Sequence, residues 1–218
     1  MCSTFKLLLV AAVLGRVDRG EETLARRVVF DADAILDWAP VTGLNVGAPG
    51  MTIGQLCEAA VIMSDNTAAN LLLATLGGPE GWTAYVRHLG NSVSRLDHTE
   101  PLNDKQSGGE DTTTPLAMLA DMRKVLLGGA LSSRSRTRLT DWVVLNQTGA
   151  QSLRAGFPVG WRIGDKTGAA TYANNDIAIV WPPHRAPLLV TVYYMTDAHD
   201  TAKRKKVLAD VGRIVATI

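Results

Sequence analysis

The chain has 218 residues, of which 46% are hydrophobic and 20% are charged, and its formal net charge at pH 7 is +1. This composition is typical of one globular domain or of two closely joined lobes, and it argues against intrinsic disorder. The interspersed charges exclude a large basic surface for nucleic acid, and no apolar run reaches the about 18 residues that a transmembrane helix needs. We therefore expect neither nucleic acid nor a membrane as a partner.

The N-terminal segment combines a serine, a lysine and a long apolar run. Ser3 and Lys6 form an S-x-x-K motif, and residues three apart lie on one face of a helix, so the amine can reach the hydroxyl. A serine nucleophile needs such a neighbour to accept its proton, although this spacing also recurs by chance. The apolar run at residues 7–14 resembles the core of a signal peptide, but no small-residue cleavage site follows it. The same run is equally compatible with a buried helix.

Hydrophobic periodicity predicts four helices in the following part of the chain, the first of them capped by Thr52: residues 51–64, 66–75, 115–128 and 133–146. Two β-rich runs separated by a proline-containing turn predict an antiparallel hairpin: residues 176–181 and 188–195. From Thr201 an amphipathic pattern predicts a closing helix. We therefore expect a mainly helical lobe at residues 1–146, followed by an α/β lobe at residues 147–218.

Three further motifs follow S-x-x-K along the chain: Ser64-Asp65-Asn66 after the first of these helices, Glu100-Pro101-Leu102-Asn103 in a loop, and Lys166-Thr167-Gly168 before the hairpin. The set S-x-x-K, S-D-N and K-T-G is the signature of class A β-lactamases and penicillin-binding proteins. Each motif is common by itself, whereas the ordered set is not expected by chance.

Longer stretches around these motifs extend the similarity: residues 63–72, 111–115, 146–149 and 164–168. From Met1 to its C-terminal helix the chain resembles a class A serine β-lactamase. The resemblance implies a single domain over residues 1–218 with the α/β fold of serine β-lactamases and penicillin-binding transpeptidases, in which an all-helical lobe adjoins an antiparallel sheet flanked by helices. It also implies a periplasmic or secreted monomer that hydrolyses β-lactam antibiotics without a metal or other cofactor.

The same resemblance assigns roles in opening the β-lactam ring. Ser3 would attack the carbonyl carbon and become acylated, while Lys6 would support removal of its proton. The backbone N–H groups of Ser3 and Ala169 would form the oxyanion hole. Ser64 would relay a proton to the ring nitrogen, and Asn66 would orient Lys6 and hold the amide of the substrate side chain.

Substrate binding is assigned to three further residues. Lys166 would attract the substrate carboxylate and assist the proton relay, and Thr167 would donate a hydrogen bond to that carboxylate. Trp38 aligns with an aromatic residue that lines the entrance of the family's site. An ordinary partly buried tryptophan explains Trp38 equally well.

Glu100 separates hydrolysis from acylation alone, because a carboxylate in this loop can activate the water that releases the acyl group. A penicillin-binding peptidase acylates with the same serine and lysine but lacks this base. Two alternatives therefore stay open, a penicillin-binding DD-peptidase or transpeptidase and an inactive, truncated remnant that at most binds β-lactams.

The loop that carries Glu100 departs from the family pattern. It is shortened, so the residue that holds the hydrolytic water is either Asn103 or Asp104. His98 stands where the family has an arginine that pairs with the aspartate at the far end of the loop, here Asp111. A neutral imidazole would close the loop less firmly, and we therefore expect a mobile loop and a wider pocket.

Other departures concern the substrate carboxylate and the start of the fold. Ala169 replaces a residue that often carries a hydroxyl. Asn175 and Ser152 occupy positions at which relatives have an arginine, and Arg154 is a candidate substitute. The helix and two strands that precede S-x-x-K in the family are expected to be missing. The α/β lobe would then keep three strands and the C-terminal helix, with a strand edge and a sheet face uncovered.

Overall fold

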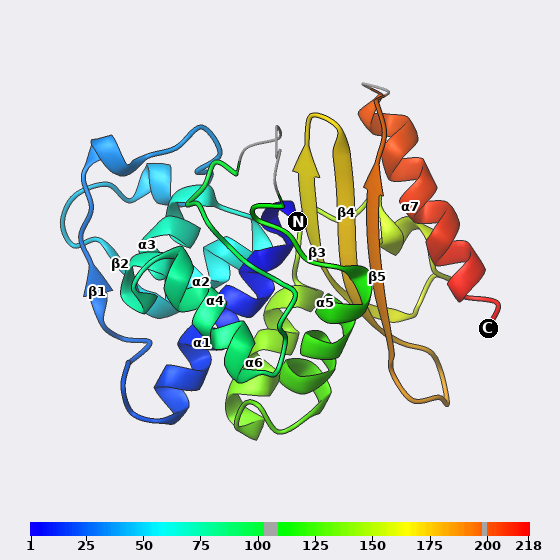
Figure 1. Ribbon diagram of the computed structural model, residues 1–218, viewed down its shortest axis with the longest axis horizontal. Helices are drawn as coiled ribbons and strands as arrows, with labels where there is room; N and C mark the ends of the chain where they lie inside the picture. The colour runs from blue at the N-terminus through cyan, green and yellow to red at the C-terminus, as the bar shows by residue number, and fades with distance from the viewer. Residues whose placement is uncertain (103–108, 198–199) are drawn as a thin grey trace.

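The computed structural model describes residues 1–102, 109–197 and 200–218. Helices gather on one side of the molecule, and an antiparallel sheet covered by one more helix forms the other side (Figure 1). The helices of the first side are α1 (Phe5–Asp18), α2 (Ile53–Ile62), α3 (Asn66–Leu76), α4 (Pro79–His88), α5 (Pro115–Met122) and α6 (Ser133–Val144). The sheet consists of β3 (Arg162–Ala170), β4 (Ala173–Trp181) and β5 (Leu188–Met195), and α7 (Thr201–Val215) covers it.

Helix α1 forms the centre of the helical side. Its side chains are buried from Phe5 to Gly15, and it packs against α2, α3, α4 and α6. A helix that is apolar on all sides is stable only when neighbours cover every face. The apolar run at residues 7–14 is therefore a core helix in this structure, and Lys6 in its first turn is carried into the interior.

The predicted helices are confirmed as α2, α3, α5 and α6, and the predicted closing helix as α7. Thr52 caps α2 in a capping box, in which its side chain accepts from the N–H of Gln55 and the Gln55 side chain accepts from the N–H of Thr52. The periodicity missed α4, because this polar helix buries only Trp82 and Val86. A π-helical segment, Arg123–Leu127, continues the direction of α5.

The three long strands pair in the order β3-β4-β5, and the predicted hairpin is confirmed as β4 and β5. The Lys166-Thr167-Gly168 motif lies within β3, although the sequence pattern placed it in front of the strands. Its register sets Lys166 opposite Ile177 and Thr167 opposite Asp176. Strand β4 is buried along almost its whole length because β3 and β5 flank it and α7 packs against it.

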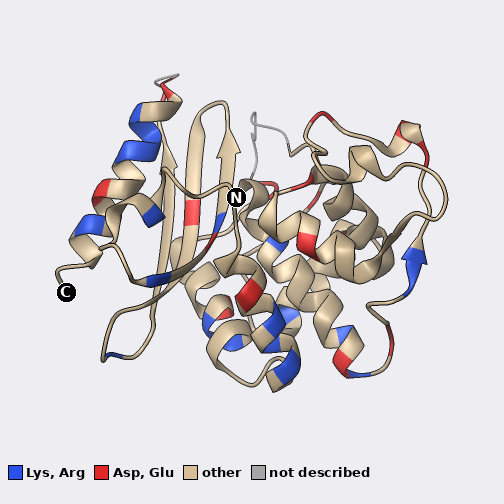
Figure 2. Ribbon diagram, turned by 180° about the vertical axis from the view of Figure 1, so that it is seen from behind, with Lys and Arg blue, Asp and Glu red and all other residues tan. Residues whose placement is uncertain are grey.

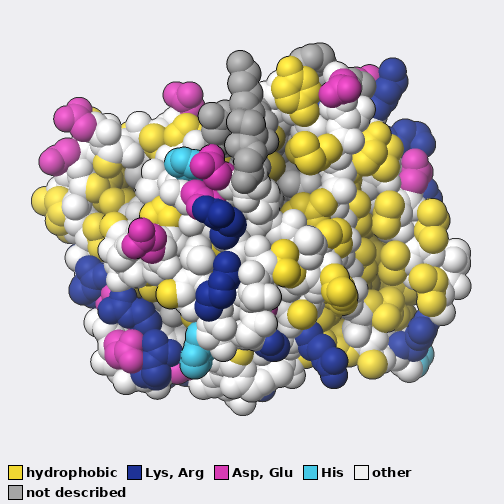
Figure 3. Space-filling model, viewed as in Figure 1, with side chains coloured by type: hydrophobic (Ala, Val, Ile, Leu, Met, Phe, Trp, Pro, Cys, Tyr) yellow, Lys and Arg dark blue, Asp and Glu magenta, His cyan; other side chains and the backbone are white. Residues whose placement is uncertain are grey.

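Two short strands on the helical side, β1 (Arg27–Val28) and β2 (Met51–Thr52), form an antiparallel pair that the sequence did not predict. Within the described residues β5 pairs only with β4, and hydrophobic side chains gather over that part of the surface (Figure 3). Strand β5 is therefore an edge of the sheet within the described residues. Lys and Arg recur along α7, while both signs of charge mix elsewhere (Figure 2). No helix in the described ranges has the length and apolar character needed to span a membrane.

Candidate active site

Ser3 and Lys6 meet at one oxygen of Glu100. Ser3 lies in the 3-10 turn Cys2–Thr4 that leads into α1, and its Oγ donates to Glu100 Oε1 over 3.0 Å. Lys6 Nζ lies 3.0 Å from the same oxygen. The sequence motif predicts that the amine of Lys6 lies over the hydroxyl of Ser3. In the structure the two side chains are linked through Glu100 Oε1, which lies far away along the chain.

Lys6 is fully buried and has two further acceptors. Its Nζ donates to the backbone carbonyl of Ser64 over 2.8 Å and to Asn66 Oδ1 over 2.6 Å. Burial lowers the pKa of Lys6 against the opposing effect of the Glu100 carboxylate. Lys6 therefore releases its proton more readily than an exposed lysine, which is the property required of a base beside a serine.

The charge on Glu100 is held by its surroundings. Burial opposes ionisation of this carboxyl group, but the nearby Lys6 ammonium and hydrogen bonds from the Leu102 amide, Lys6 and Ser3 outweigh it, so the pKa of Glu100 is lowered. Glu100 is consequently a carboxylate at neutral pH. A carboxylate that already accepts a hydrogen bond from the Ser3 hydroxyl can accept its proton or that of a water molecule.

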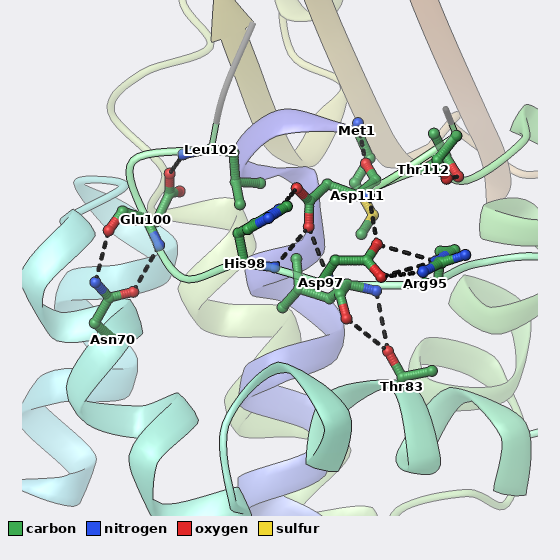
Figure 4. Close-up of polar contacts among 12 residues, drawn as sticks. Met1, Asn70, Thr83, Arg95, Asp97, His98, Glu100, Leu102, Asp111 and Thr112 are labelled. Carbon is green, nitrogen blue, oxygen red and sulfur yellow. Dashed lines mark hydrogen bonds and ion pairs between the residues drawn. The ribbon is translucent and has the colours of Figure 1, made fainter. Parts of the chain in front are cut away.

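Asn70 on α3 fixes the backbone at Glu100, as the left half of Figure 4 shows. The Asn70 Nδ2 donates to the Glu100 carbonyl over 2.8 Å, and the Glu100 N–H donates to Asn70 Oδ1 over 2.8 Å. The Leu102 N–H donates to Glu100 Oε2 over 2.9 Å. Asn70 was not singled out from the sequence, because a lone asparagine inside a helical segment carries no spacing signal.

His98 and Asp111 join the two ends of the loop that carries Glu100 (Figure 4). His98 Nδ1 lies 2.7 Å from Asp111 Oδ2, and the N–H groups of Asp97 and His98 donate to Asp111 Oδ1. The hydrogen bond with Asp111, followed by the charge of Asp111, raises the pKa of His98. This shift favours the charged imidazolium, in contrast to the neutral imidazole assumed from the sequence. Mobility of the loop stays a prediction.

Ser64 occupies the turn between α2 and α3 in a left-handed conformation, with φ of 57°. Such a conformation is uncommon for a non-glycine residue and is often found at functional sites. Asp65 holds this turn, because its carboxylate accepts from the N–H groups of Val41, Thr42 and Ala68 and from the Thr42 hydroxyl. The Ser64 side chain is thereby fixed in the direction of β3.

Lys166 on β3 meets Ser64 from the opposite side of the site. Its Nζ donates to Ser64 Oγ over 2.9 Å and to the backbone carbonyl of Thr167 over 2.9 Å. Burial, followed by the charge of Lys6, lowers the pKa of Lys166 to about 7. The Thr167 hydroxyl lies 2.5 Å from Thr148 Oγ1, a partner that the sequence analysis did not identify.

Gly168 lets β3 approach the turn that carries Ser3. A Cβ at this position would lie 3.2 Å from the Ser3 backbone nitrogen and 3.1 Å from the Met1 carbonyl oxygen. The next residue, Ala169, therefore lies on a strand beside Ser3, as a two-amide oxyanion hole requires. The joint role of the Ser3 and Ala169 amides stays a prediction.

Trp38 lies at the rim of this group, with 53% of its surface exposed. Its indole Nε1 donates to the Met63 carbonyl over 2.9 Å, and its own carbonyl accepts from the Asn66 N–H. Trp38 is thus bound to both sides of the Ser64 turn and still exposes much of its ring. Asn103 falls outside the described residues, so its expected role with the hydrolytic water stays a prediction.

The candidates for the missing arginine all turn inward. Arg154 donates to the buried carboxylate of Asp165 and to the Val144 carbonyl, Ser152 is buried, and Asn175 donates to the Met1 carbonyl. Their partners keep these side chains within the protein. Within the described residues, Lys166 is therefore the buried cation whose amine contacts the Ser64 side chain, while Lys6 contacts the Ser64 backbone carbonyl.

Fold and site together are those of a serine hydrolase, because the Ser3 hydroxyl, two buried lysines and the Glu100 carboxylate lie in one group. The whole chain, residues 1–218, matches the family model described as the beta-lactamase enzyme family. Beta-lactamase OXY-2 of Klebsiella oxytoca is 44% identical, with 99% of this chain and 75% of that protein covered. A beta-lactamase of Streptomyces lavendulae is also 44% identical, with 100% of this chain and 73% of that protein covered.

Solved structures agree with this assignment. An ancestral class A β-lactamase (GNCA) has a TM-score of 0.97 and 54% identity, with 100% of this chain and 84% of that chain covered. A putative class A β-lactamase, PenP from Rhodopseudomonas palustris, has a TM-score of 0.96 and 50% identity, with the same coverage. The chain belongs to the class A serine β-lactamases. Its activity is hydrolysis of β-lactams through a serine acyl-enzyme, and it confers resistance to these antibiotics.

Proposed function

We propose that Ser3 is the nucleophile of this β-lactamase and that Glu100 and Lys6 together remove its proton. The contact that carries the proposal is Ser3 Oγ to Glu100 Oε1 at 3.0 Å, because Lys6 Nζ lies 3.0 Å from the same oxygen. As Ser3 Oγ attacks the carbonyl carbon, its proton passes to this pair. Negative charge then develops on the carbonyl oxygen, which the backbone N–H groups of Ser3 and Ala169 receive.

Ring opening requires a proton on the departing nitrogen, and Ser64 is the proposed donor. The hydrogen bond from Lys166 Nζ to Ser64 Oγ supports this role, because Lys166 can return the proton that Ser64 gives up. With a pKa of about 7, Lys166 exchanges protons near neutral pH. Its ammonium form and the Thr167 hydroxyl bind the substrate carboxylate, and Asn66 holds the substrate's side-chain amide while it orients Lys6.

Deacylation depends on the second proton transfer to Glu100. Once Ser3 Oγ is esterified, the Glu100–Lys6 pair releases the Ser3 proton to solvent, and Lys166 regains from solvent the proton that it passed to Ser64. Glu100 is then again a carboxylate and can take a proton from the water molecule that attacks the ester, and this proton returns to Ser3 Oγ as the ester bond breaks. Asn103 is the proposed second partner of that water. Trp38 lines the entrance to the site.

The test is nitrocefin turnover combined with intact-mass detection of the acyl-enzyme. Glu100→Ala is expected to acylate and then to retain the bound group, whereas Glu58→Gln, which changes an exposed glutamate on α2, serves as the matched control. Fast turnover by Glu100→Ala would contradict the mechanism. Persistent acylation of the unaltered protein would contradict the deacylating role of Glu100, and absence of acylation would contradict Ser3 as the nucleophile.

We also propose that the protein acts as a monomer outside the cytoplasm, in the periplasm or the medium, as implied by its class A relatives. The helical part at residues 1–146 and the α/β part at residues 147–218 are proposed to form the two lobes of one domain. Light scattering of the purified protein tests the monomeric state, and cell fractionation tests the location outside the cytoplasm. One cooperative unfolding transition is expected for a single domain.

A further inference from the structure

Behind Lys166, on the side of the sheet away from Ser64, lie two buried carboxyl groups. Asp165 precedes Lys166 on β3 and Asp176 lies on β4; their exposed fractions are 1% and 0%. The register pairs Asp165 with Ala178 and Asp176 with Thr167, so the two aspartates are diagonal neighbours on one face of the sheet. The mechanism above gives neither of them a role.

Each aspartate uses one oxygen and leaves the other without a partner. Asp165 Oδ1 accepts from Arg154, and Asp176 Oδ2 accepts from the Leu153 N–H over 3.0 Å. Asp165 Oδ2 and Asp176 Oδ1 are buried and accept no hydrogen bond from the described residues. The Asn146 side chain is close enough to lower the pKa of Asp165, but its Nδ2 makes no well-formed hydrogen bond. Native proteins rarely leave such oxygens unpaired.

The charges around this pair are unequal. Arg154 faces Asp165 directly, whereas Asp176 receives only a backbone N–H at its accepting oxygen. Burial raises the pKa of both groups, and the charge of Asp165 raises that of Asp176 further. On α7, which packs against β4, the buried cation is Arg204, and its Nε donates to Asn174 Oδ1. The Arg154 guanidinium thus favours the charged form of Asp165, while Asp176 has no cation at its accepting oxygen.

We propose that Asp176 is a positioning residue that is protonated in the working enzyme and donates a hydrogen bond from Oδ1 to Oδ2 of Asp165. One proton then satisfies both unpaired oxygens. The pair carries a single negative charge, which contacts the Arg154 guanidinium and raises the pKa of Lys166. Asp176 touches neither substrate nor the reacting atoms and acts on the reaction only through Asp165.

The consequence concerns the charge on Lys166. Burial and Lys6 lower its pKa, while negative charge on Asp165 or Asp176 raises it. A neutral Asp176 leaves Asp165 as the one carboxylate of the pair that stabilises the ammonium. Two ionised aspartates would favour the ammonium more strongly and hinder the proton return to Ser64. This part of the inference rests on the proposed role of Lys166.

The direct test is infrared spectroscopy of the unaltered protein near pH 7, with Asp176→Asn as the reference. We expect a carbonyl stretching band of a protonated carboxylic acid that Asp176→Asn abolishes. Absence of that band, or its survival in Asp176→Asn, would overturn the proposal. This measurement needs no substrate, so it is independent of any role assigned to Lys166.

Kinetic measurements then test whether protonation of Asp176 affects the charge state of Lys166. Asn keeps an uncharged donor toward Asp165, so kcat/KM of Asp176→Asn should stay within about threefold and its alkaline pH limb should not move. Asp176→Leu lacks the donor, so its kcat/KM should fall about tenfold or more. Asp165→Asn removes the remaining negative charge and should shift the alkaline limb of the kcat/KM profile to lower pH by about one unit or more. If Asp176→Asn shifted that limb as Asp165→Asn does, Asp176 would be ionised and the proposal wrong.

The controls separate this inference from the proposed function. If Asp176→Leu does not fold, the infrared band and the Asp176→Asn profile still decide the outcome. If Lys166→Ala left turnover unchanged while the carboxylic acid band was present, the role of Lys166 would fail and the protonation of Asp176 would stand.

Discussion

Replacing Asn70 by alanine tests how far the positioning of Glu100 limits deacylation. Two hydrogen bonds of 2.8 Å join the Asn70 side chain to the backbone N–H and carbonyl of Glu100, a residue that is 7% exposed. A hydrogen bond of this kind contributes about 1 kcal/mol net, so the loss of both removes about 2 kcal/mol. That free energy corresponds to a factor of about 30 in the population of the correctly held carboxylate.

Asn70→Ala is therefore expected to lower the free energy of unfolding by about 2 kcal/mol and the deacylation rate constant by up to about 30-fold. Acylation should fall less, since Lys6 and Ser3 still contact the Glu100 side chain. Urea unfolding and pre-steady-state quench with mass detection measure the two effects. Asn45→Ala is the matched control, because Asn45 is exposed and bonds only locally to the Val41 carbonyl. Equal deacylation in Asn70→Ala and Asn45→Ala would refute the reasoning.

Two further changes test the loop closure and a helix end. The pKa of His98 is raised above its ordinary value of 6.5, so the ion pair with Asp111 stabilises loop closure fully below pH 6.5 and is lost as pH rises through the raised value. His98→Arg should remove this decline from the pH profile of deacylation, and superimposable profiles of the two proteins would contradict it. Thr52→Ala removes the N-cap of α2 and should cost about 1 kcal/mol of stability in urea unfolding. Thr217→Ala, near the C-terminus, is the comparison variant and should be nearly neutral.

Residue types, their order and the local elements could be read from the sequence. The periodic helices, the hairpin and the cap at Thr52 depend on neighbours within a few residues, which is why the pattern alone revealed them. Helix α4 was not predicted, because it buries only two side chains. The sequence placed the K-T-G motif before the hairpin without assigning it to a strand, because pairing with β4, a long-range contact, defines that strand.

Contacts between residues far apart in the sequence are determined by the tertiary structure. The sequence paired Ser3 with Lys6 by spacing, whereas the tertiary structure brings one oxygen of Glu100 within 3.0 Å of both side chains. Asn70 and Asp176 gave no signal, since neither belongs to a spacing pattern and the partners of each lie far away along the chain. The sequence motifs identify the candidate reactive residues, while their burial and long-range contacts in the tertiary structure determine their protonation states.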